Sequence, residues 1–189
     1  MSGSAIRWPK GTGVPLGGVW AIGVASGAAI LWAVPSYYRD PDAPTPTVPR
    51  RVGVTALIER DGLYLVERRA DSEAGEWAFV GGGLDEESVL EALHREVLEE
   101  TGLEIEQASV FGVFSDPTRI IAYPDSNICR ITSIAFRVQL RGAADPAPSD
   151  ESRGMRFVSS DELAILPFWS VHLPIREALL SDDGRVVVA

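Results

Sequence analysis

The stretch from Gly81 to Leu103 constrains this chain more than any other part of its sequence. Ser88 is suited to cap a helix, because Glu91 follows three residues later and completes a capping box. Gly102 is suited to end that helix, because glycine readily adopts the left-handed conformation found after a helix. Apolar residues between these ends recur at helical spacing and predict one buried stripe. They are Val89, Leu90, Leu93 and Val97.

Three carboxylates, those of Glu96, Glu99 and Glu100, share one flank of the predicted helix, because residues three or four apart are neighbours. Acids placed together in this way repel one another, and Mg2+, which prefers oxygen ligands, would relieve the repulsion. Arg95 is four residues before Glu99 and is placed to hold its carboxylate. The glycines at 81–83 permit close backbone approach to a ligand. The pattern therefore indicates a divalent-cation site, and the competing interpretation is a solvated acidic face on a core helix.

The residues Gly81, Glu87 and the run 95–103 resemble the Nudix box in full, with the five-residue and seven-residue spacings of that motif. Counted from the pair Gly81-Gly82, however, the turn is one residue short, and Glu87 falls one position before the box glutamate. The resemblance covers about residues 36–189 and implies the Nudix fold, an α/β/α sandwich with a mixed β-sheet. It also implies metal-dependent hydrolysis of a diphosphate bond in a nucleoside diphosphate linked to another group.

The same resemblance assigns roles within the box. Mg2+ or Mn2+ is the expected cofactor, with the carboxylates of Glu96, Glu99 and Glu100 and the carbonyl of Gly81 as its ligands. Arg95 is expected to orient these acids. Glu99 and Glu100 are also candidates for the catalytic base, and a third candidate lies outside the box.

That third candidate is Glu151. In the family, an acid six residues before an aromatic residue supplies a further metal ligand or the base, and Glu151 precedes Phe157 at this spacing. Asp150 and a plain loop acid are the competing interpretations. His172 is another conceivable base, but a histidine without a paired Asp or Cys is more often structural.

Three residues are candidates for substrate binding. Arg69 ends a predicted strand over residues 63–69, where relatives often place an arginine against substrate phosphate, and a guanidinium can pair phosphate oxygens bidentately. Arg119 and Tyr123 lie in a predicted loop over residues 115–127, which is long enough to carry specificity. Arg119 is suited to phosphate and Tyr123 to base stacking, while a self-packed surface loop is the alternative for both.

The charge of the chain is concentrated near the predicted metal site. The net charge is −10, and between Asp85 and Glu106 there are nine acids and one arginine. This balance argues against duplex nucleic acid as a partner, because phosphate backbones are bound by clustered Lys and Arg. A small nucleotide substrate is expected instead, and a homodimer stays open. The single cysteine, Cys129, excludes an internal disulfide.

The chain begins with an apolar segment, taken here as residues 1–35. Val14 to Val34 is 21 residues without charge, which is long enough to span a bilayer. A membrane anchor through residues 14–34, a secretory signal and a non-native extension before the domain are the open interpretations. Since secretion would separate a hydrolase from its nucleotides, we expect residues 36–189 to form a cytoplasmic domain, membrane-anchored if the segment spans. A nucleotide sensor that binds without turnover is the alternative to an enzyme.

Overall fold

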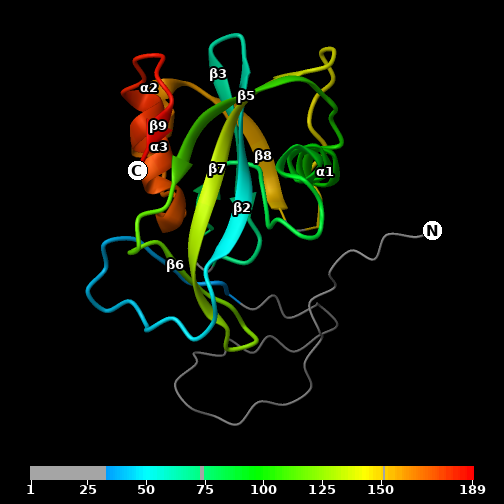
Figure 1. Ribbon diagram of the computed structural model, residues 1–189. Helices are drawn as coiled ribbons and strands as arrows, with labels where there is room; N and C mark the ends of the chain where they lie inside the picture. The colour runs from blue at the N-terminus through cyan, green and yellow to red at the C-terminus, as the bar shows by residue number, and fades with distance from the viewer. Residues whose placement is uncertain (1–32, 73–74, 151) are drawn as a thin grey trace, which may run out of the picture. The chain divides into compact units, whose positions relative to one another are not determined.

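The computed structural model describes residues 33–72, 75–150 and 152–189 of the 189-residue chain (Figure 1). Most of the predicted membrane anchor at residues 14–34 lies outside these ranges and stays a prediction. Within the described ranges, no helix combines the length and the apolar character needed to cross a bilayer.

Within the described residues, nine strands join into one sheet. The strands are β1 (Ser36–Tyr37), β2 (Arg51–Arg60), β3 (Leu63–Arg69), β4 (Trp77–Ala78), β5 (Ile105–Phe114), β6 (Ile120–Ala122), β7 (Ile128–Leu140), β8 (Ser152–Val158) and β9 (Val187–Val188). The helices are α1 (Val89–Thr101), α2 (Ser160–Ile165), the 3-10 turn η1 (Ser170–His172) and α3 (Leu173–Leu180). β2 runs parallel to β7, whereas β5 is antiparallel to β7 and β3 is antiparallel to β8, so the sheet is mixed.

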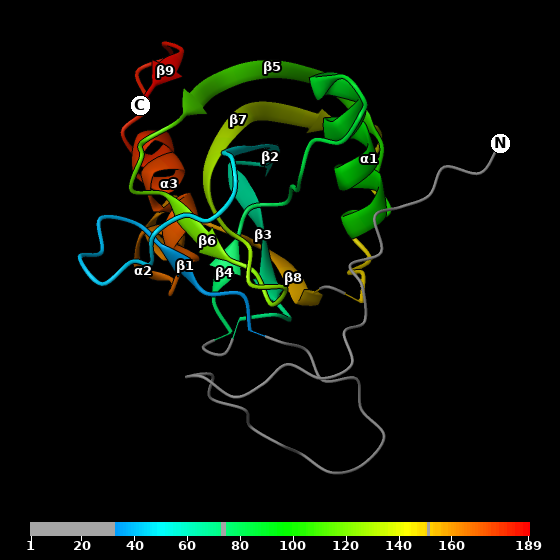
Figure 2. The same cartoon turned by 60° about the horizontal axis from the view of Figure 1, so that its bottom comes forward.

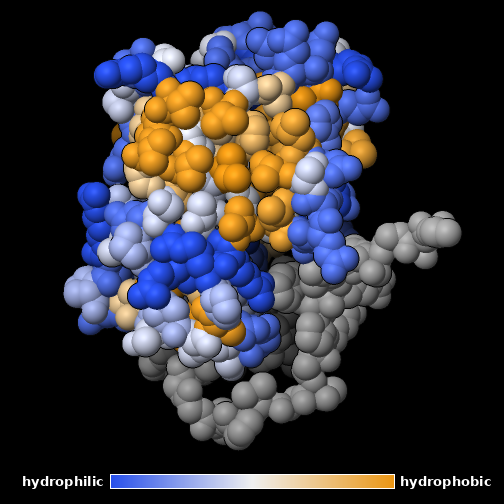
Figure 3. All heavy atoms as spheres, viewed as in Figure 1, coloured by the Kyte–Doolittle hydropathy of each residue, from blue (hydrophilic) through white to orange (hydrophobic). Residues whose placement is uncertain are grey.

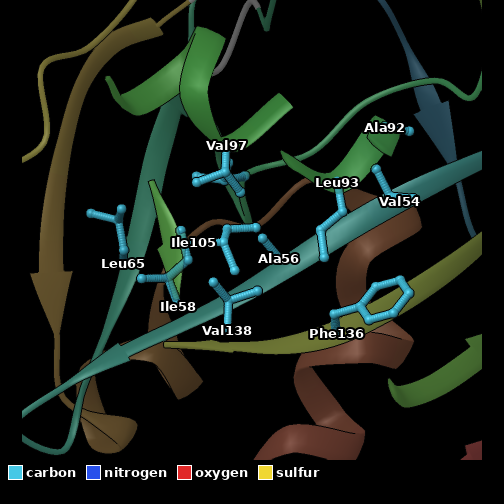
Figure 4. Close-up of a cluster of buried hydrophobic side chains, with 11 residues drawn as sticks. Val54, Ala56, Ile58, Leu65, Ala92, Leu93, Val97, Ile105, Phe136 and Val138 are labelled. Carbon is cyan, nitrogen blue, oxygen red and sulfur yellow. The ribbon is translucent and has the colours of Figure 1, made fainter. Parts of the chain in front are cut away.

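The sheet lies between two helical layers, as Figure 1 shows with α1 on one side and α2 and α3 on the other. Side chains of a strand point alternately to opposite faces. On β2, Val54 and Ile58 therefore pack in one cluster with Leu93 of α1, while Leu57 packs in another with Ile175 of α3. Figure 4 shows the cluster beneath α1. The predicted α/β/α sandwich is confirmed.

The predicted ends of α1 are confirmed. The Ser88 hydroxyl accepts the N–H of Glu91, and the Glu91 carboxylate accepts the N–H of Ser88, which completes the capping box. Gly102 ends the helix in the left-handed conformation, with φ 70°. The predicted stripe was wrong at one position, because the Leu90 side chain is 53% exposed and Ala92 is buried in its place.

The segment after β5, predicted as a loop over residues 115–127, is only partly a loop. Residues 115–127 contain a short strand, β6, which pairs with β7 and also with β1. β5 and β7 are strongly curved (Figure 2), and their pairing register shifts at two places. Bulges of this kind bend the strands that carry them.

Apolar side chains gather over β5 and its neighbouring strands on one face of the domain (Figure 3). Val110 of β5 is 45% exposed and Val188 of β9 is 80% exposed. Large apolar surfaces are common where proteins meet a partner. The sequence left a homodimer open, and the question stays open here.

Arg119, predicted to bind substrate phosphate, lies inside the protein and not at its surface. Its side chain is fully buried. The guanidinium donates to the carbonyl oxygens of Phe114 and Val171 and, at 2.8 Å, to the Ser133 hydroxyl. Desolvation lowers the pKa of Arg119 to about 10. This side chain joins the end of β5 to η1 and β7, and a buried group with its donors used in this way is out of reach of a substrate.

We expect Arg119→Lys to destabilise the fold by about 3 kcal/mol or more, because one ammonium cannot replace a planar fork that reaches three acceptors. Urea unfolding of the purified variant measures this. Arg130→Lys is the matched control, since Arg130 is exposed on β7 and makes one hydrogen bond to the carbonyl of Pro117. An Arg119→Lys variant as stable as wild type would contradict the structural role.

Candidate active site

The glycine run at 81–83 passes between β2 and α1. The N–H of Val54 donates to the carbonyl of Gly82 at 2.9 Å, which ties the run to β2. Gly81 has φ 147°, and a Cβ there would lie 2.2 Å from the carbonyl oxygen of Val54. A Cβ on Gly82 would lie 2.4 Å from the carboxylate of Glu96. Only glycine allows the backbone to come this close to both neighbours.

The carboxylates of Glu96 and Glu100 point from α1 toward this run. Glu100 is 8% exposed, and one of its oxygens accepts the N–H of Gly81 at 2.9 Å. Burial raises the pKa of Glu100 well above its ordinary value, the charge of Glu67 raises it further, and the Gly81 hydrogen bond acts in the opposite direction. The Glu96 side chain is 12% exposed. Two of the three predicted ligands therefore lie on the same side of the helix end.

Glu99, the third predicted ligand, faces outward. Its side chain is 54% exposed, and one oxygen lies 3.2 Å from a guanidinium nitrogen of Arg95. This exposure leaves Glu99 accessible to water, as a general base requires. The structure thus separates the three acids of the box into an inner pair and an outer one.

Arg95 links these acids to the glycine run. Its guanidinium lies 2.6 Å from Glu87, 2.7 Å from Glu96 and 3.2 Å from Glu99, and it donates to the carbonyl of Gly83 at 3.1 Å. The hydrogen bond from Arg95 lowers the pKa of Glu87. The arrangement is the one that an orienting arginine needs.

A second buried acid, Glu67 of β3, escaped sequence reasoning. Glu67 is 2% exposed and lies 4.0 Å from the guanidinium of Arg69. The available signal was its position two residues after Leu65, which places both side chains on one face of the strand.

The chemistry of these donors fits a divalent cation. Glu96 and Glu100 are hard oxygen donors near one helix end, and Mg2+ and Mn2+ prefer such ligands. No three His, Cys, Asp or Glu side chains of the described ranges already form a metal-binding cluster. Arg95 forms ion pairs with two of the predicted ligands, Glu96 and Glu99.

The remaining predicted residues lie in different surroundings. Arg69 donates to both oxygens of Asp71, at 2.8 and 2.5 Å, and its guanidinium lies 3.9 Å from the ring centroid of Trp169. Tyr123 is partly buried, and the guanidinium of Arg51 lies 4.9 Å from its ring centroid. Both stay predictions as substrate contacts. Glu151 lies outside the described residues, so its assignment also stays a prediction.

His172 has a structural place, as its lack of a paired Asp or Cys suggested. It is 5% exposed, and its Nδ1 accepts the backbone N–H of Phe79 at 3.3 Å. Its ring lies 5.0 Å from that of Trp169, measured between centroids. Desolvation lowers the pKa of His172 well below its ordinary value, and the charges of Arg119 and Arg69 act in the same direction. A neutral imidazole therefore supports the strand that leads into the glycine run.

Comparisons with known proteins agree with this geometry. A family model described as NUDIX domain matches residues 49–179. The nucleoside triphosphatase NudI of Salmonella typhimurium is 34% identical over 122 residues, which cover 61% of this chain and 86% of that protein. The solution structure of the E. coli ORF135 protein has a TM-score of 0.57 at 26% identity and covers 74% of this chain and 94% of that one. An ADP-ribose pyrophosphatase from Streptococcus suis has a TM-score of 0.56 at 22% identity, covering 73% and 96%, and shows the shared fold alone.

We expect His172 to make the protein less stable as the pH falls below about 6.5, the ordinary pKa of histidine. Below that pH the unfolded chain binds a proton at His172 while the folded chain does not, so the free energy of unfolding decreases until the pH reaches the lowered folded pKa. The loss is at most about 1.4 kcal/mol per pH unit. Thermal unfolding between pH 7 and pH 5 measures it, and His172→Gln should flatten this part of the profile.

His94→Gln is the control for loss of an imidazole, since His94 is exposed on α1. The same pH dependence in wild type and His172→Gln would show that other groups govern acid stability.

Proposed function

Because the chain belongs to the Nudix family, we propose that it is a metal-dependent hydrolase that cleaves a diphosphate bond of a nucleoside triphosphate. The observation that carries the proposal is the complete set of box acids around Arg95, with Glu100 buried against the glycine run. Membership in the family makes the chain a Nudix hydrolase, and family members generally use Mg2+ or Mn2+.

The positions of the residues suggest a separate role for each. Glu96 and Glu100 would hold the cation, because their carboxylates lie together beside the glycine run. A divalent cation at such a site polarises phosphoryl oxygens and lowers the pKa of bound water. Glu99 is the exposed acid and would accept the proton from the attacking water, with Glu151 as the alternative base. Arg69 would hold phosphate oxygens, which requires its fork to be shared with Asp71.

The choice of a nucleoside triphosphate follows from the relatives. NudI, named a nucleoside triphosphatase, shares 34% identity with this chain over most of its own length. The ADP-ribose pyrophosphatase is similar at 22% identity, which supports the fold and not the substrate. We therefore expect a nucleoside monophosphate and pyrophosphate as products.

We expect Glu100→Gln to lower kcat by about 100-fold or more on the best substrate, since one carboxylate that binds the cation or moves a proton is removed. The measurement is nucleoside monophosphate release from a panel of nucleoside triphosphates, ADP-ribose and dinucleoside polyphosphates, with and without Mg2+. Glu99→Gln, assayed beside it, tests the proposed proton acceptor.

Glu106→Gln is the matched control, because Glu106 is an exposed acid of β5 outside the box helix. Wild-type turnover by Glu100→Gln would contradict the site assignment. Tight nucleotide binding with no turnover on the whole panel would instead favour a sensor, and cleavage of ADP-ribose alone would overturn the substrate.

A further inference from the structure

We propose that Asp71, a residue of the turn after β3, is a positioning residue for the substrate. It holds the Arg69 guanidinium in one orientation, so that the donors not used by Asp71 are presented to a substrate phosphate. The inference rests on the proposed function, in which Arg69 holds phosphate oxygens. Asp71 acts through Arg69 and does not itself touch the substrate.

The ion pair between these two residues uses one edge of the guanidinium. Nε and Nη2 of Arg69 donate to the two carboxylate oxygens of Asp71, at 2.8 and 2.5 Å. A guanidinium presents N–H donors along two edges, and each edge can pair with two oxygens. The pairing with Asp71 leaves the edge formed by Nη1 and the second N–H of Nη2. Arg69 can therefore hold Asp71 and a phosphate at the same time.

The Trp169 ring sets the plane of the guanidinium. The central carbon of the Arg69 guanidinium lies 3.9 Å from the ring centroid, and a planar guanidinium stacks well on an aromatic face. Trp169 is 7% exposed, and its backbone N–H donates to the carbonyl of Trp77 on β4 at 2.8 Å. The ring is thus itself fixed. With its plane set by the ring and its rotation set by Asp71, the guanidinium has one orientation.

The turn that carries Asp71 is also tied down. The Asp71 carbonyl accepts the N–H of Val34 at 2.8 Å, and the N–H of Arg69 donates to the carbonyl of Glu76 at 3.0 Å. The side chains of Arg69 and Asp71 are 18% and 24% exposed. Ion pairs that water reaches usually add little to stability. This pair is therefore better suited to orienting Arg69 than to stabilising the fold.

The second edge of Arg69 lies toward the acids of the site. Its Nη1 lies 4.0 Å from the carboxylate of Glu67, and the charge of Glu67 acts in turn on Glu100 of the box. A phosphate held at the box acids through a cation would approach Arg69 from this side. If Asp71 did not hold the guanidinium, attraction to Glu67 would compete with the phosphate for the same donors.

Asp71→Asn tests the proposal, because asparagine keeps the size of the side chain but has only one oxygen to accept from Arg69. We expect KM for the best substrate to rise about 10-fold while kcat stays within about twofold, since a misplaced guanidinium weakens ground-state and transition-state binding alike. The Kd for inorganic pyrophosphate, measured with Mg2+ by calorimetry, should rise with KM. Asp71→Glu, which keeps both oxygens, should recover part of the loss.

A double-mutant cycle shows whether Asp71 acts through Arg69. Arg69→Met keeps an apolar side chain against Trp169 and removes the donors, so it should raise KM and the Kd for pyrophosphate by itself. Adding Asp71→Asn to Arg69→Met should then change neither value further. An equal further rise in that background would overturn the inference.

The matched control is Asp182→Asn. Asp182 pairs with Arg137 at 2.5 Å and its side chain is 27% exposed, close to the 2.5 Å and 24% of Asp71. The control makes the same change in net charge and breaks an ion pair of the same kind, at a residue without a proposed role in the site. It should leave KM and the Kd for pyrophosphate unchanged.

The outcomes separate this inference from the proposed function. If wild type turns over and Asp71→Asn keeps the wild-type KM and Kd, the role of Asp71 is refuted while the proposed function stands. If Asp71→Asn is unfolded, or loses stability with KM unchanged, Asp71 serves the fold and the inference is also refuted. If wild type cleaves nothing on the panel, the proposed function fails and the inference falls with it.

Discussion

Negative charge buried at the C-terminal end of α1 is the constraint on which the rest of the site depends. Glu100 lies there at 8% exposure, beside the negative end of the helix dipole. A carboxylate in that position is stable only if donors or cations reach it. The glycine run supplies one donor, the N–H of Gly81 at 2.9 Å, and this needs a backbone path that side chains would block. The glycines and the acid are therefore two parts of one electrostatic arrangement.

The surroundings of the site serve the same arrangement from farther away. The Val54 N–H fixes the carbonyl of Gly82, so β2 sets the position of the glycine run. His172, uncharged in the core, accepts the N–H of Phe79 just before that run. Arg119 ties η1, which ends at His172, to β5 and β7. The buried polar side chains of His172 and Arg119 thus help to hold the strand that leads into the glycine run.

Local chemistry explains what could be predicted from the sequence. The capping box at Ser88 and the left-handed residue Gly102 depend on neighbours within a few positions, so the limits of α1 followed directly. The strand predicted over residues 63–69 likewise has the bounds that β3 shows. The box spacing predicted which acids share a helix flank. It could not separate the inner pair, Glu96 and Glu100, from the outward Glu99, because the direction in which each side chain points relative to the core depends on where the sheet lies.

Contacts between distant segments could not be predicted. Arg119 looked like a loop residue because nothing nearby in sequence shows that β6 forms and that η1, 52 residues away, supplies a carbonyl. Leu90 fitted the apolar stripe by spacing, yet it is 53% exposed. Glu67 was hidden for the same reason, since only the packing of β3 under α1 brings it toward Glu100.

The turn before α1 bears on a question that the spacing left open. Glu87 gives Arg95 its shortest contact, at 2.6 Å, which agrees with the strict counting that makes it the box glutamate. The Gly83 carbonyl accepts from the same guanidinium, and the N–H of Leu84 donates to the carbonyl of Val52. Hydrogen bonds therefore fix the backbone of Gly83 and Leu84 in this turn. With Glu87 as a firm partner, Arg95 can share its remaining donors between Glu96 and Glu99, and the orientation of the box acids depends on that anchor more than on the length of the turn.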